Sequence, residues 1–174
     1  MPFALPYDLK QILFSLLDVD QRSFATQPDS RVDKFLAYWA GLATARGAYP
    51  GRTDLDPIGM DVRLLPNLFI VEILKSEDGR HRFRYRLLGA TIIEFELAKA
   101  GKHLDEITNR DVSDIEQHYE AAANGCISLR RSNLGWLEEA LSGQSYSVVV
   151  LPLADDGKVP THLLGLCLYD GYET

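Results

Sequence analysis

Residues 77–101, with the sequence EDGRHRFRYRLLGATIIEFELAKAG, contain the pattern that most constrains how this chain can fold. Phe83, Tyr85 and Leu87 alternate with three arginines, which is the period-two pattern of a strand with one buried and one solvated face. Gly89 then permits a sharp reversal of the backbone before a second apolar pattern at helical spacing. The stretch therefore predicts a strand that turns directly into a helix, an arrangement typical of a sheet covered by helices.

The helix expected after this reversal has recognisable ends. Thr91 and Glu94 have the spacing of a capping box, and Gly101 suits the left-handed residue that closes a helix. Ile92 and Phe95 are expected to face the buried side chains of the strand, while the three arginines face solvent or the N-terminal helices.

Composition narrows the class of protein and its partners. A chain of 174 residues is long enough for one domain with a proper core and an appendage. The net charge of −7 argues against a nucleic-acid partner, because phosphate binding needs a basic surface. The chain lacks both an apolar run of the ~20 residues needed to cross a bilayer and a signal peptide, so we expect a cytoplasmic protein without a membrane partner. Cys126 and Cys167 form no CxxC spacing, so neither a disulfide framework nor a zinc site is expected.

The chain divides into three parts: an N-terminal helical extension (1–47), a turn-rich connector (48–67) and a sheet-containing domain (68–174). The extension carries an apolar stripe that must be buried, and this stripe makes the N-terminal helices the candidate surface for a homodimer. The stripe consists of Val32, Phe35, Leu36, Trp39, Leu42 and Ala43.

Periodicity within the domain predicts two strands, a helical insert and three further strands. The first two strands are expected to form a hairpin through an Asp78-Gly79 turn. Besides the arginine-alternating strand, the expected strands span 68–74, 127–134, 146–153 and 162–169, and the longest helix of the insert spans 113–124.

Four segments of the sequence carry a resemblance to a known family. They read WAGLATARGAYPGRTDLDP, LLPNLFIVEI, FRYRLLGATIIEFELAKAGKHLDEI and VVVLPLADDGKVPTHLLGLCLYD. Over residues 35–170 they resemble a bacterial PAS-like family of mostly uncharacterised, often single-domain proteins. The resemblance implies an α+β fold with a five-stranded antiparallel sheet, with helices on one face and an N-terminal helical extension. Such a fold can enclose a small-molecule pocket between the sheet and the helices; the resemblance names no ligand and no cofactor.

If the fold is PAS-like, a ligand pocket is lined by the inward side chains of the second strand and the helical insert. Tyr85 and Tyr119 are the residues expected to orient a ligand, since a buried phenol requires a hydrogen-bond partner. The alternative is a filled core without a pocket. The predicted ligand-binding residues are Phe83, Tyr85, Leu87, Ile92, Phe95, Leu104, Ile115, His118 and Tyr119.

Three further motifs are interpreted without a catalytic role. His118 lies beside the apolar face of the insert helix and is interpreted as a solvent-edge side chain, because a single histidine carries little metal signal. Asp54 and Asp56 resemble a paired-carboxylate motif but are expected to serve turns and helix caps. The arginines of the strand are expected to be offset by nearby acidic groups such as Glu72. No catalytic residue and no metal ligand is predicted.

These observations lead to one main hypothesis and two alternatives. The main hypothesis is a non-catalytic PAS-like sensory or regulatory module that binds a small ligand or a protein partner and signals in trans or through dimerisation. The first alternative is a small α+β enzyme that acts on an apolar substrate in the same cavity, with Tyr85, Tyr119 and His118 as acid-base groups. The second is a protein-interaction module with a solid core.

Overall fold

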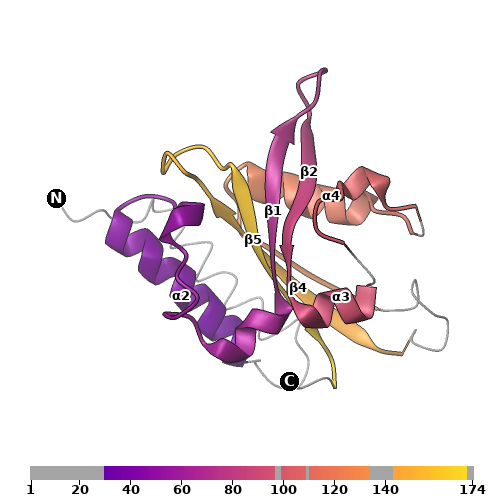
Figure 1. The fold of residues 1–174 in the computed structure, drawn as a ribbon, viewed down its shortest axis with the longest axis horizontal. Helices are drawn as coiled ribbons and strands as arrows, with labels where there is room; N and C mark the ends of the chain where they lie inside the picture. Colours follow the sequence, from indigo (N-terminus) through magenta and orange to yellow (C-terminus); the bar gives the residue numbers. More distant parts are fainter. Residues whose placement is uncertain (1–29, 97–98, 109, 134–142, 172–174) are drawn as a thin grey trace.

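The computed structural model describes residues 30–96, 99–108, 110–133 and 143–171, and these residues form an α+β fold (Figure 1). The helical elements are α2 (Ser30–Arg46), η1 (Arg52–Asp54), η2 (Val62–Asn67), α3 (Ala90–Glu96), η3 (Leu104–Glu106) and α4 (Ser113–Ala123). The strands are β1 (Leu68–Lys75), β2 (His81–Leu88), β3 (Ser128–Asn133), β4 (Ser145–Leu153) and β5 (His162–Tyr169).

The five strands form one antiparallel sheet in the order β2-β1-β5-β4-β3. β1 and β2 form a hairpin through the predicted turn, where Gly79 has a φ of 80°. β3, β4 and β5 form a meander, and β5 pairs with β1 to join the two parts. The predicted α+β class, the five-stranded antiparallel sheet and the order of its elements are confirmed.

Helix α2 covers one face of the sheet, which we call the α2 face (Figure 1). Phe35 and Trp39 are fully buried there, and the Trp39 Nε1 donates a hydrogen bond to the Pro152 carbonyl oxygen at 2.9 Å. The predicted boundary at residue 47, between the N-terminal extension and the connector, therefore separates α2 from the strands with which it shares a core. The strand side chains of this core are Leu68, Ile70, Val149, Leu151, Leu153, Leu164, Leu166 and Leu168.

Helices α3 and α4 cover the opposite face, which we call the α4 face (Figure 1). Ile92 from α3, Leu104 from η3, and Ile115 and Tyr119 from α4 are buried against it. Helices thus cover both faces of the sheet, so its central strands β1, β4 and β5 contribute nearly continuous apolar sequences. The strand side chains of this core are Phe69, Val71, Phe83, Tyr85, Tyr146, Val148, Val150, Leu163, Cys167 and Tyr169.

A register shift in the β1–β2 pair corrects one prediction. Ile70 pairs with Leu87 but the next residue of β1, Val71, pairs with Tyr85, so Arg86 is an extra residue on β2. Because a one-residue bulge reverses the faces of the residues beyond it, Leu87 does not follow Tyr85 inward. Leu87 is 46% exposed, and Leu88 packs against the core of the α4 face in its place.

The end of α3 also differs from the prediction. The described part of this helix ends at Glu96, and Gly101 lies in a later turn with a φ of 88°. The Gly101 N–H donates to the Tyr85 carbonyl oxygen at 2.6 Å, and the Tyr85 N–H donates to the Lys102 carbonyl oxygen at 2.9 Å. Gly101 therefore takes the left-handed conformation expected of it, but it uses this conformation to bring the chain back along the outer edge of β2.

Candidate functional site

A small cavity, called the α4 cavity below, lies on the α4 face between the sheet and the helices. Its lining combines apolar walls with four polar side chains. The apolar and thiol-bearing lining residues are Phe69, Leu88, Ile92, Ile115, Val148 and Cys167. The polar lining residues are Tyr85, Arg110, Tyr119 and Arg130.

The size of the α4 cavity limits what it can hold. Its volume is about 20 Å³ and it is partly open to solvent. One water molecule requires ~10–15 Å³ of such space, whereas pockets for drug-sized ligands are typically ~300–1,000 Å³. In this conformation the cavity therefore admits one or two water-sized groups, and a larger ligand has to extend through the opening.

Tyr85 and Tyr119 place two phenol hydroxyls together beside the cavity, with the two oxygens 3.1 Å apart. Tyr85 projects from β2 and Tyr119 from α4, so this contact joins the sheet to its covering helix. The ring of Phe69 lies 6.4 Å from that of Tyr85 and 6.2 Å from that of Tyr119, centroid to centroid. The packed rings hold both hydroxyls in an apolar environment, where a hydrogen bond is electrostatically stronger than in water.

The structure brings together part of the predicted ligand-binding set. Phe83 and Leu104 are buried in the same core but do not line the cavity. Phe95 is half-buried and stacks on the ring of Tyr169 at a centroid distance of 4.3 Å, while Leu87 is exposed as described above. The predicted residues that do line the cavity are Tyr85, Ile92, Ile115 and Tyr119.

Sequence reasoning missed the two arginines of the α4 cavity. Arg110 lies in the loop before α4, where no periodic pattern marks its direction. Arg130 lies on edge strand β3, next to Leu129, which packs on the α2 face. Successive side chains of a strand point to opposite faces of the sheet, so a Leu129 on the α2 face implies an Arg130 on the α4 face. The inward direction of Arg130 could therefore have been inferred from the sequence.

The guanidinium groups of Arg110 and Arg130 have different surroundings. Nε and Nη1 of Arg110 are buried away from solvent. The Arg130 side chain is 11% exposed; its Nη1 donates to Asp114 Oδ2 at 3.0 Å, and its guanidinium lies 5.3 Å from the ring centre of Tyr146. Burial disfavours the charge of Arg130, but Tyr146 and Asp114 outweigh this effect and raise its pKa, so it stays cationic.

His118 lies beside the α4 cavity and outside its lining. Its Nδ1 is hydrogen-bonded with the Ser128 hydroxyl, and its Nε2 lies 3.7 Å from Asp114 Oδ1. Burial lowers the pKa of His118 below its usual value, against the opposing effect of Asp114. The fold thus assembles a serine, a histidine and an aspartate that the sequence spacing did not reveal, but Ser128 is only 6% exposed.

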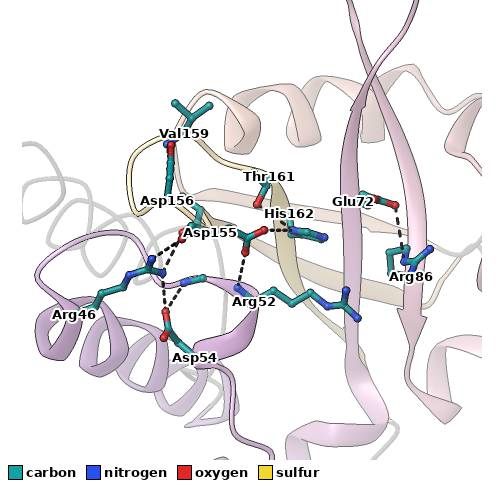
Figure 2. A network of polar contacts seen from close by, with 12 residues as sticks. Arg46, Arg52, Asp54, Glu72, Arg86, Asp155, Asp156, Val159, Thr161 and His162 are labelled. Carbon is teal, nitrogen blue, oxygen red and sulfur yellow. Dashed lines mark hydrogen bonds and ion pairs between the residues drawn. The ribbon is translucent and has the colours of Figure 1, made fainter.

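A second polar network fastens α2 to the β4–β5 connection (Figure 2). Arg46 donates to Asp54 Oδ2 at 2.8 Å and to the Asp155 carbonyl oxygen at 2.6 Å. The Asp155 carboxylate accepts from the Arg52 backbone N–H at 3.2 Å and lies 3.8 Å from His162 Nδ1. Burial lowers the pKa of His162, while the nearby Asp155 carboxylate acts in the opposite direction. These contacts join α2, η1 and the start of β5, which supports a structural role for the network.

The arginines of β2 face away from the α4 cavity and pair with acidic residues. Arg84 donates to Glu72 Oε2 at 2.9 and 2.5 Å, and Arg86 lies 3.9 Å from the same oxygen (Figure 2 shows the Arg86 contact). Arg82 forms two hydrogen bonds with Asp105, at 2.7 and 3.0 Å. Burial opposes ionisation of Glu72, but Arg84 outweighs it and lowers the pKa of that carboxyl group. The expectation that nearby acidic groups offset these arginines is confirmed, with Glu72 serving Arg84 and Arg86 and Asp105 serving Arg82.

The roles expected of Asp54 and Asp56 are also confirmed. Asp54 Oδ2 accepts from the Gly51 backbone N–H at 2.6 Å at the start of η1. Asp56 Oδ1 accepts from the Ile58 backbone N–H at 2.9 Å, two residues along the chain. Both carboxylates therefore serve local turns.

The described residues contain neither a metal-binding cluster nor a membrane-spanning helix. Within these residues, no group of three or more His, Cys, Asp or Glu side chains is arranged to hold a metal ion. Nor does any helix among them have the length and apolar character required to span a membrane.

No protein-family model matches the sequence, and no curated protein matches it.

Proposed function

We propose that this protein is a cytoplasmic, non-catalytic PAS-like module that senses or regulates by binding a small ligand in the α4 cavity and signalling to a partner protein or a second copy. One observation carries the proposal: α3, η3 and α4 cover one sheet face and leave a partly open cavity beside the paired hydroxyls of Tyr85 and Tyr119. Convergent polar groups in an otherwise apolar pocket are typical of ligand sites.

The order of the elements supports the PAS-like assignment. A strand hairpin, a helical insert and a three-stranded meander follow one another in the chain, and β1 pairs with β5. This is the order on which the sequence resemblance depends, and the α4 cavity lies between sheet and insert, where the resemblance places a pocket. A shared fold does not name a function, so the ligand has to be identified by experiment.

The homodimer part of the proposal depends on residues 1–29, which lie outside the described residues. The α2 stripe offered as a dimer surface is covered by the sheet of the same chain: Val32, Phe35 and Trp39 are buried. Within residues 1–29 the sequence places Leu9, Ile12, Leu13, Leu16 and Leu17 at the spacing of one helical face. Light scattering of the full chain and of an L13E/L16E variant, which adds charge to this pattern, tests the proposal. We expect a dimer that becomes a monomer in the variant; a monomeric full chain excludes the dimer.

Ligand binding is tested by native mass spectrometry of the purified protein and by thermal shift across a metabolite panel. A ligand that binds the folded state raises the melting temperature according to its concentration and affinity. Val148→Phe adds a ring to the cavity wall and should abolish the shift, whereas Val159→Phe makes the same change at an exposed site and should preserve it. Absence of any bound molecule and any shift refutes ligand binding and favours the solid-core interaction module.

The enzyme alternative has one specific observation in its favour, the contact of Ser128, His118 and Asp114. A neutral histidine that is hydrogen-bonded to a serine hydroxyl can act as its general base, and the lowered pKa of His118 favours the neutral form. The burial of Ser128 argues against it, because a substrate carbonyl cannot reach the hydroxyl without movement of β3. Turnover of an activated ester that disappears in Ser128→Ala would establish the enzyme in place of the sensor.

A further inference from the structure

Among the described residues, the lining of the α4 cavity has cationic side chains and no acidic ones. Arg110 and Arg130 are two of its ten described lining residues, and none of these ten is Asp or Glu. The carboxylate paired with Arg130, that of Asp114, is 61% exposed and is not one of the lining residues. A ligand group that enters this cavity therefore encounters positive charge in an environment with apolar walls.

The donors around the cavity match an acceptor with more than one oxygen. A guanidinium group presents N–H donors in a fixed planar fork that suits two oxygen acceptors, and the buried Nε of Arg110 belongs to such a fork. In the Tyr85–Tyr119 pair one hydroxyl donates to the other, so the pair can donate at most one further hydrogen bond at the same cavity. The apolar walls lower the local dielectric, which strengthens charge-assisted hydrogen bonds.

The size of the cavity narrows the class of ligand further. A volume of about 20 Å³ accommodates one or two water-sized groups. The two oxygens of a carboxylate are of this size, and its carbon leads away from them toward the opening. Leu88 and Ile92 line the same cavity and offer apolar contact to a short hydrocarbon remainder. A tetrahedral phosphate presents more oxygens than this volume holds, and its hydration would have to be replaced in an apolar pocket.

We infer that the α4 cavity binds the carboxylate group of a small organic acid. Arg110 and Arg130 supply the charge, the Tyr85–Tyr119 hydroxyl pair supplies one further donor, and the remainder of the acid lies against Leu88 and Ile92. This inference rests on the proposed function, because it names the ligand class of the same cavity.

The first experiment compares ligands on the unmodified full chain at constant ionic strength. Formate, acetate and propionate are titrated by calorimetry and thermal shift, beside acetamide, phosphate and chloride. Acetamide has nearly the shape of acetate but no charge. We expect the three acids to bind and acetamide to bind ~10-fold or more weakly, since hydrogen bonds to charged groups are the stronger class. We expect no binding of phosphate or chloride in the same range.

The second experiment compares matched variants. Arg110→Gln should weaken acetate binding by ~10- to 100-fold. Arg131→Gln makes the same change on β3, where Arg131 pairs with Asp170 on the surface, and should leave the affinity unchanged. Tyr119→Phe removes one donor and should weaken binding by a smaller factor, while the protein remains folded. If Arg110→Gln does not fold, the ring resonances of labelled tyrosines in the unmodified protein give the answer: they should shift with acetate and not with acetamide.

The outcomes separate this inference from the proposed function. Equal binding of acetate and acetamide, or equal loss in Arg110→Gln and Arg131→Gln, overturns the carboxylate assignment. Binding of a neutral panel ligand alone, blocked by Val148→Phe, also overturns it but leaves the ligand-binding module in place. Absence of binding by acids and by every panel ligand overturns both.

Discussion

Gly165→Ala tests how the α4 face is packed. Gly165 on β5 pairs with Phe69 on β1, and the Phe69 ring lies directly over the glycine. A Cβ added at Gly165 would lie 1.9, 2.2 and 2.3 Å from three atoms of that ring. Carbon atoms in contact are ~3.5–4.0 Å apart, so the ring or the strand has to move by ~1.5 Å or more.

The cost follows from this overlap. The Phe69 ring lines the α4 cavity and packs against the rings of Tyr85 and Tyr119, which restrict its movement. Overpacking of this kind costs about 1–3 kcal/mol. In a chain of this length each kcal/mol lowers the melting temperature by ~2–4 °C, so we expect a decrease of ~2–12 °C.

The matched control is the same substitution in helix α2. A Cβ added at Gly41 would meet no atom within 4 Å, and alanine favours a helix interior over glycine by ~0.5–1 kcal/mol. Gly41→Ala should therefore stabilise the protein while Gly165→Ala destabilises it. Urea unfolding monitored by circular dichroism gives both changes, provided that the two variants have the same m-value.

A double variant identifies the Phe69 ring as the cause. Phe69→Leu removes the overlapping ring atoms, so Gly165→Ala should cost less in that background than in the unmodified protein. Neighbouring residues that share one space are expected to depart from additivity by ~0.5–3 kcal/mol. Gly165→Ala with unchanged stability, or costs that simply add in the double variant, would refute the packing argument.

Three further predictions concern other parts of the fold and are measured by the same unfolding assay. Trp39→Phe removes the hydrogen bond to the buried Pro152 carbonyl and should cost ~1–3 kcal/mol from that loss alone; a neutral effect would contradict the packing of α2 on the sheet. Gly89→Ala places a Cβ 2.1 Å from the Pro66 carbonyl oxygen, a backbone atom, and should cost at least the upper part of ~1–3 kcal/mol; wild-type stability would refute this close approach. Burial lowers the pKa of His162, so the unfolded chain binds a proton more readily than the folded protein, and stability should fall as the pH drops through and below the ordinary histidine pKa of ~6.5. In His162→Gln this part of the pH dependence of stability should disappear. An unchanged profile in the variant would exclude His162 as its source.

The alternation around Phe83 and Tyr85 was sufficient to predict a strand and its buried face, and the Asp78-Gly79 turn predicted the hairpin. The alternation failed one residue later, at Leu87, because a bulge changes the face of every side chain beyond it without changing the local composition. The stability of such a bulge depends on the neighbouring strand β1, whose pairing is not encoded within β2.

The sequence predicted which residues face the candidate site where they follow the period of a helix or a strand, and not elsewhere. Ile115 and Tyr119 share one face of α4, and their inward direction follows from helical spacing. Arg110 lies in a loop without a period, so only the fold shows that it reaches the same cavity as Tyr119. The contact of His118 with Ser128 likewise joins α4 to β3, and neither residue belongs to a recognisable motif.

The sequence by itself determined the class of fold, the order of its strands and helices, and the turn roles of Asp54 and Asp56. These properties depend on side-chain periods of two and 3.6 residues and on turn chemistry, all of which act over a few neighbouring positions. Only the tertiary structure decided that α2 covers the second face of the sheet, and that Arg110 and Arg130 line one small cavity. Such placements depend on strand pairing and packing between residues far apart in the chain, and no local pattern specifies them.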